Sequence, residues 1–194
     1  MKTMARKKGV PGMKKSFLIC AAAHFALVGA AHSETTIVKA ARYLDVASGN
    51  YVPPAVIVIE DGRIAAINPA QAPDGAIVDL GGKTLLPGLM DAHVHLTFDI
   101  EPGFEFAPVR GTAADEALRG AANAKKTLFA GFTTVRNLGA GGFSDVSLMK
   151  AIYRGFVAGP HIIPAGHSLG VTGGHCDATG FAPGILELGP EEGV

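Results

Sequence analysis

The stretch "LPGLMDAHVHL" (Leu86 to Leu96) separates two differently patterned parts of the sequence and contains its most unusual residues. His93 and His95 stand two positions apart in an otherwise apolar run, with Asp91 two positions before the first histidine. Side chains alternate across a β-strand, so a strand here would place all three side chains on one face. Histidine packs poorly in an apolar core, which raises the question of what this face does.

Two imidazoles about 7 Å apart along a strand can converge on one metal ion, with bonds of about 2.0–2.1 Å. The alternative is a pair of solvated histidines on a half-exposed strand, which an isolated His-x-His favours. Here the pair is framed by an apolar strand, a preceding Pro87-Gly88 and a following strand–helix pattern. This context favours His93 and His95 as metal ligands.

Upstream of this stretch, residues 34–86 have a β pattern. Three β-branched runs, at residues 35–45, 55–67 and 76–86, are separated by turn-forming residues. Asp61-Gly62, between two apolar runs, predicts a hairpin. We expect a small β-sandwich-like domain that packs against another part of the protein.

Downstream, residues 87–194 alternate between strand and helix patterns. A strand at the His-x-His stretch is followed by a predicted helix with Thr112 as N-cap, Asp115 three residues later and Gly131 as its end. A second strand ("FTTVRNLG"), a second helix ("SDVSLMKAIYRGFVAG") and a third strand ("HIIPAG") follow. This order is typical of parallel βαβ units in an α/β fold.

Helical spacing predicts which side chains these two helices bury. In the first helix they are Ala117, Ala121, Ala124 and Leu128, and in the second Leu148, Met149, Ile152, Tyr153 and Phe156.

The motifs "GGKTLLPGLMDAHVHL", "FAGFTTVRNLG" and "GPHIIPAGHSLGVTGGH" together resemble the metal-dependent amidohydrolase superfamily. The resemblance is closest to the branch of imidazolonepropionase-like enzymes and Xaa-Pro dipeptidases. It implies a β-domain followed by the first three βα units of a TIM (β/α)8 barrel. It also implies hydrolysis of carbon–nitrogen bonds, in dipeptides or N-acyl amino acids, with one or two divalent ions, zinc being the expected metal.

Carried over to this sequence, the resemblance makes His93 and His95 the ligands of the first barrel strand and Asp91 a neighbouring motif residue. Family members commonly read Arg-Asp-Leu-Gly where this chain has Arg136-Asn137-Leu138-Gly139, so no acidic or supporting role is carried over to Asn137. Loops after barrel strands build the active site, which makes His175 a candidate substrate-contacting residue. A solvated loop histidine is the alternative for His175.

A complete barrel takes about 250 residues, and a catalytic zinc usually has three protein ligands. We therefore expect the general base and remaining ligands beyond Val194, an incomplete barrel, and a chain that is inactive and poorly soluble alone. A non-catalytic exported binding protein and one half of a split hydrolase remain open alternatives.

Residues 1–33 contain six Lys or Arg and no acidic residue, followed by a short apolar run and a small-x-small site at Ala31 and Ser33. This arrangement is typical of a signal peptide, so we expect an exported protein, periplasmic or secreted, without a stable membrane span after cleavage.

The whole chain has 17 basic and 17 acidic residues, so the part that follows residue 33 carries a net charge of −6. An acidic surface repels phosphates, which argues against nucleic-acid binding and leaves a small molecule or dipeptide as the partner. Whether the chain forms a homo-oligomer stays open.

Overall fold

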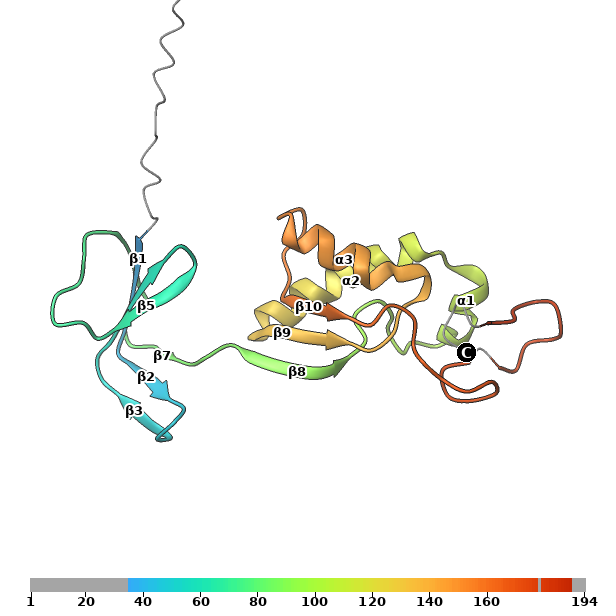
Figure 1. Cartoon of the computed structure of the whole chain (residues 1–194), viewed down its shortest axis with the longest axis horizontal. Helices are drawn as coiled ribbons and strands as arrows, with labels where there is room; N and C mark the ends of the chain where they lie inside the picture. Colours follow the sequence, from blue (N-terminus) through green and yellow to red (C-terminus); the bar gives the residue numbers. More distant parts are fainter. Residues whose placement is uncertain (1–34, 178, 190–194) are drawn as a thin grey trace, which may run out of the picture.

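The computed structural model describes residues 35–177 and 179–189. The predicted signal peptide lies outside these residues. None of the helices in the described ranges is both long and apolar enough to cross a membrane. The described chain forms a β-rich part and a mixed α/β part, joined by an extended segment between β7 and β8 (Figure 1).

The β-rich part contains two sheets in place of the three simple runs expected from the sequence. One has the strand order β5-β4-β1-β6 and the other the order β3-β2-β7. The strands are β1 (Thr35–Ala40), β2 (Arg42–Asp45), β3 (Asn50–Val52), β4 (Ala55–Glu60), β5 (Arg63–Ile67), β6 (Ala76–Asp79) and β7 (Thr84–Leu85). Strand β1 pairs antiparallel with β4 and parallel with β6, and its buried Ile37 packs in the centre of the larger sheet.

The predicted hairpin at Asp61-Gly62 is confirmed. It joins the antiparallel strands β4 and β5, and both turn residues have positive φ, 50° at Asp61 and 74° at Gly62. Two consecutive positive φ angles match the twist of a two-residue hairpin, which is why Asp-Gly is favoured there.

The run at residues 35–45 is not one strand. It divides at Ala41, whose N–H donates to the Lys83 carbonyl at 3.0 Å, and its halves β1 and β2 join different sheets. A continuous β-branched run indicates strand conformation but does not show where a strand changes partners.

The α/β part is built on a parallel sheet with the order β10-β9-β8, formed by β8 (Leu89–Val94), β9 (Phe132–Asn137) and β10 (His161–Pro164). The connections are α2 (Ala113–Phe129) and α3 (Ser144–Tyr153), preceded by the short elements η1 (Phe104–Phe106), α1 (Ala107–Arg110) and η2 (Gly141–Phe143). The predicted strand–helix alternation with parallel pairing is confirmed. Both α2 and α3 cover the same face of the sheet (Figure 1).

The predicted start and end of α2 are also confirmed. The Thr112 hydroxyl accepts a hydrogen bond from the Asp115 N–H, and the Asp115 carboxylate accepts one from the Thr112 N–H, which completes a capping box. At the other end, Gly131 has φ 100°, a conformation that glycine adopts at low cost.

The core of the α/β part lies between the sheet and these two helices. Its buried members are Leu96, Ala124, Val135, Leu148 and Ile162, with Val94, Ala121, Phe132, Met149, Ile152 and Val157 packed against them. The side chains predicted to be buried in α2 are buried or half-buried.

The prediction for the end of the second helix is wrong at two aromatic residues. Tyr153 is 90% exposed and Phe156 is 76% exposed. The helix ends at Tyr153, and Gly155 then takes φ 74°, so the helical spacing no longer applies at Phe156.

Candidate metal centre

His93 and His95 lie at and just beyond the carboxyl end of β8, and both side chains are exposed. Their ring centroids are 5.4 Å apart with an interplanar angle of 68°. The residues next to them, Val94 and Leu96, pack into the core under the helices. The two imidazoles therefore share the face of the sheet that α2 and α3 leave open.

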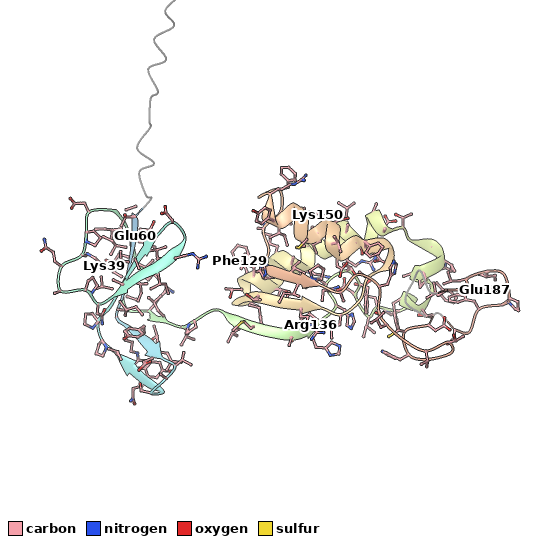
Figure 2. The ribbon with its side chains drawn as sticks, viewed as in Figure 1. Lys39, Glu60, Phe129, Arg136, Lys150 and Glu187 are labelled. Atoms are coloured by element: carbon pink, nitrogen blue, oxygen red, sulfur yellow. The ribbon has the colours of Figure 1, made fainter. Side chains whose placement is uncertain are left out.

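The open face is continuous across the three strands. On β9, exposed Arg136 follows buried Val135, and on β10 Ile163, 50% exposed, follows buried Ile162. Figure 2 shows Arg136 on the side of the sheet away from the helices. The histidine pair is thus placed beside a cationic and an apolar residue on a solvent-accessible surface.

Asp91 does not share this face, contrary to the alternation expected from the sequence. Together with Val94 and residues of α2 such as Lys126, it lines a shallow hollow on the helix-covered side. The register with β9 shifts between Asp91 and Val94, and such a bulge changes the face on which later side chains lie. The Asp91 Oδ1 atom instead accepts the His93 N–H at 3.0 Å, which ties it to the backbone of the first histidine.

A buried polar network joins the carboxyl ends of the three strands. Asn137 and Asp145 are each fully buried. The Asn137 Oδ1 atom accepts the Leu96 N–H at 2.8 Å, while its Nδ2 donates to the Gly139 carbonyl at 3.1 Å and to Asp145 Oδ2 at 3.2 Å. The same Asp145 oxygen accepts the Gly166 N–H at 3.1 Å, just beyond β10. Two side chains therefore connect the residue after His95 with the ends of β9 and β10.

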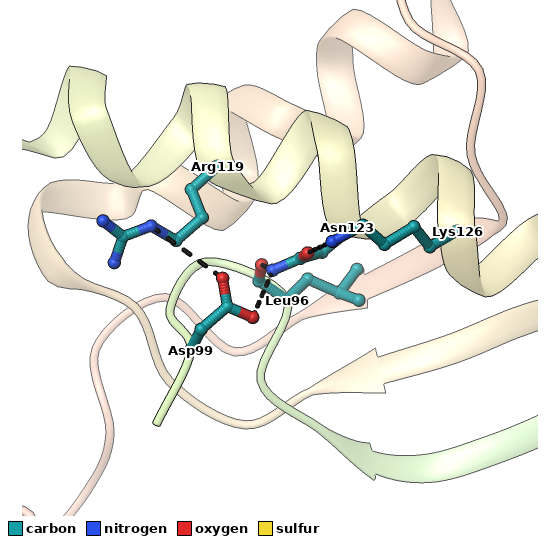
Figure 3. A network of polar contacts seen from close by, with 5 residues as sticks. All are labelled: Leu96, Asp99, Arg119, Asn123 and Lys126. Atoms are coloured by element: carbon teal, nitrogen blue, oxygen red, sulfur yellow. Dashed lines mark hydrogen bonds and ion pairs between the residues drawn. The ribbon is translucent and has the colours of Figure 1, made fainter. Parts of the chain in front are cut away.

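The carbonyl of Leu96 is held by a side chain of α2 (Figure 3). The Asn123 Nδ2 atom donates to this carbonyl and to Asp99 Oδ1, both at 3.0 Å. Lys126 Nζ donates to Asn123 Oδ1 at 3.4 Å, and Arg119 Nε lies 4.0 Å from Asp99 Oδ2. The sequence did not indicate roles for Asn123, Asn137 and Asp145, because their bonds to the backbones of Leu96 and Gly166 join residues 21 to 41 positions apart.

The structure does not bring His175 to the histidine pair. It is exposed in the loop after β10, where local bonds shape the backbone, such as that from the Gly173 N–H to Asp177 Oδ2 at 2.7 Å. His167 is half-buried and packs edge-on against the Phe143 ring, with ring centroids 4.6 Å apart and an interplanar angle of 74°. A substrate-contacting role for His175 stays a prediction.

Across residues 35–177 and 179–189, no group of three or more His, Cys, Asp or Glu side chains is placed to hold a metal ion. The donor set of the pair is nonetheless suited to a metal, because imidazole nitrogen is a common ligand for zinc and related divalent ions. His93 and His95 therefore fit part of a coordination sphere, with further ligands required to complete it.

The sequence pattern of the amidohydrolase family matches residues 84–189, a segment that contains β8, both long helices and the histidine pair. The chain belongs to the amidohydrolase family. The enzymes of this family are hydrolases and depend on metal ions. The sequence resemblance carried by the His-x-His stretch is thereby confirmed at family level.

Individual relatives of this amidohydrolase-family chain include an imidazolonepropionase from Rhizobium rhizogenes, 30% identical over 99 residues that make up 48% of this chain and 24% of the relative. Among solved structures, a Xaa-Pro dipeptidase with methionine in its active site aligns with a TM-score of 0.71 and 33% identity, covering 82% of this chain and 40% of that one. A prolidase complexed with N-methylphosphonate-L-proline aligns with a TM-score of 0.63 and 32% identity, covering 73% and 34% respectively. The chain thus spans well under half the length of these relatives.

Proposed function

We propose that this chain contributes the first two metal ligands, His93 and His95, to a hydrolase that cleaves carbon–nitrogen bonds of dipeptides or N-acyl amino acids. The observation that carries the proposal is the pair of exposed imidazoles, 5.4 Å apart, on the open face of a parallel sheet. Ligand sites in α/β folds lie at the carboxyl ends of such strands, where this pair is found.

A divalent ion bound here would supply Lewis acidity and lower the pKa of a coordinated water toward neutrality. His93 and His95 would present two imidazole nitrogens to the ion from one strand end, and the strand backbone would fix the separation of the two rings. Since catalytic zinc sites usually have three protein ligands, hydrolysis requires at least one ligand from outside the described residues.

The dipeptide assignment draws support from the two solved structures, a Xaa-Pro dipeptidase and a prolidase with a proline phosphonate bound. Arg136 lies on the same open face as the pair and offers a positive charge for a substrate carboxylate. Another relative is an imidazolonepropionase, a name that indicates a different kind of substrate. Hydrolysis of a carbon–nitrogen bond is therefore the general part of the proposal, and the dipeptide substrate is its specific part.

The zinc-loaded chain tests this proposal through binding of N-methylphosphonate-L-proline, measured by isothermal titration calorimetry. A phosphonate coordinates zinc and the proline carboxylate resembles that of a dipeptide, so we expect binding to the loaded chain and none to the His93→Ala/His95→Ala variant. Equal binding by both proteins, or by neither, would contradict the proposed substrate class. We expect no turnover of Xaa-Pro dipeptides by the 194-residue chain, and zinc-dependent turnover would show that two imidazoles suffice.

A further inference from the structure

Leu96, the residue after His95, has both of its backbone polar groups held by asparagine side chains. Asn137 on β9 accepts the Leu96 N–H at 2.8 Å, and Asn123 on α2 donates to the Leu96 carbonyl at 3.0 Å. Leu96 is 4% exposed, so neither polar atom is left to bulk water. We call Asn137 and Asn123 together the asparagine clamp.

Each amide of the clamp is oriented by a charged partner. Asp145 accepts from Asn137 Nδ2 at 3.2 Å, which directs the Asn137 oxygen toward Leu96. Asp99 accepts from Asn123 Nδ2 at 3.0 Å, and Lys126 donates to the Asn123 oxygen at 3.4 Å. A side-chain amide has a hydrogen-bond donor and an acceptor, and each of the two asparagines uses its donor and its acceptor.

The clamp acts where the regular sheet no longer supports the chain. Strand β8 ends at Val94, whose carbonyl accepts the Leu138 N–H at 3.0 Å, and His95 follows beyond the last ladder residue. A side chain beyond the last hydrogen-bonded residue of a strand has conformational freedom, and a metal ligand loses this freedom when it binds the ion. Holding the backbone N–H and carbonyl of the next residue, Leu96, removes that freedom before the ion arrives.

We infer that Asn137 and Asn123 are positioning residues that fix the backbone after His95 so that its imidazole stays paired with that of His93 for metal binding. The inference rests on the proposed metal-binding function of the pair. Neither asparagine is placed to touch the ion, and both act through the backbone of Leu96.

Two variants test the clamp in the full chain. Asn137→Ala removes both the acceptor for the Leu96 N–H and the donor that faces Asp145. Asn123→Ala removes the donor to the Leu96 carbonyl at a half-buried helix position that alanine occupies well, so this variant is expected to fold. Val135→Ala is the matched control, because it loses buried packing on β9, two residues before Asn137, and no polar contact.

The readouts are the zinc dissociation constant and the hydrogen-exchange rate of the Leu96 amide by NMR. Supporting residues of metal ligands typically change metal affinity 10–100-fold, so we expect both asparagine variants to weaken zinc binding at least about tenfold. Asn137→Ala should also accelerate Leu96 exchange, because the acceptor of the Leu96 N–H is lost. Val135→Ala should lower the unfolding midpoint while leaving the zinc dissociation constant within about twofold of wild type.

The swapped variant Asn137→Asp/Asp145→Asn keeps an acceptor for the Leu96 N–H and one donor–acceptor pair between these positions, so it should bind zinc more tightly than Asn137→Ala. Loss of affinity in Val135→Ala equal to that in the asparagine variants would overturn the inference, because destabilisation alone would then explain the effect. Wild-type affinity in both asparagine variants would overturn it as well. If the wild-type chain binds no more zinc than His93→Ala/His95→Ala, the proposed function itself fails and the inference fails with it.

Discussion

The two faces of the sheet β8–β9–β10 differ sharply although they are built from alternating residues of the same strands. The covered face is mainly apolar, with Val135, Leu148 of α3 and Ile162 at 2% exposure or less, although half-buried Asp91 also lies on it. The open face presents His93 and Arg136 to solvent. Residues that stabilise the fold and residues available for chemistry are therefore separated by one position along a strand, and substitutions on the two faces should have separable effects.

The largest expected effect is on the covered face. Leu148→Ala removes a side chain that is 2% exposed at the centre of the core, which should lower the free energy of unfolding by about 3 kcal/mol. Tyr153→Ala, in the same helix but 90% exposed, should change it by less than about 0.5 kcal/mol. Urea denaturation measures both, and equal losses would show that the assignment of covered and exposed positions on α3 is wrong.

A smaller effect is expected at the start of α2, the other helix of the covered face. Thr112→Ala removes the hydroxyl that accepts the Asp115 N–H and should cost about 1 kcal/mol of stability, as loss of an N-cap typically does. Thr112→Ser keeps the hydroxyl and is the matched control. A Thr112→Ala variant as stable as Thr112→Ser in urea denaturation would contradict the role of the capping box.

The smallest effect concerns the pH dependence that the capping box adds. Hydrogen bonds from the Thr112 hydroxyl and N–H lower the pKa of Asp115 below its usual 3.8. A depressed folded-state pKa stabilises the fold above the unfolded pKa, and this contribution is lost as the pH falls through the folded value. Unfolding midpoints of wild type and Asp115→Asn, compared from pH 6 to pH 3, should therefore differ most at pH 6 and converge toward pH 3. A constant difference would show that Asp115 ionisation contributes nothing.

Much of the fold was predictable because its signals are local. Apolar alternation located the parallel strands, helical spacing located the buried side of α2, and Thr112 with Asp115 marked its start. The exposed Tyr153 shows the limit of such spacing at a helix end, where the backbone leaves helical geometry within two residues.

The candidate site was predictable only in part. His93 and His95 were recognisable as a pair from their spacing, since sharing a face follows from strand geometry. Asp91 was misplaced because a bulge has no reliable signal in a single sequence. Asn123 and Asn137 bond the Leu96 backbone from 27 and 41 residues away, and no local sequence pattern indicates contacts over such separations.

Zinc titration of the full chain by isothermal calorimetry tests most directly whether the exposed imidazole pair at the end of β8 holds a metal ion. We expect a binding site in the wild-type chain that His93→Ala/His95→Ala abolishes, with no change in the unfolding midpoint, since both side chains are exposed. His161→Ala, at the amino end of β10 and two strands away from β8 in the sheet, should leave that site intact. Zinc binding by His93→Ala/His95→Ala that equals that of the wild-type chain would contradict metal binding by the pair.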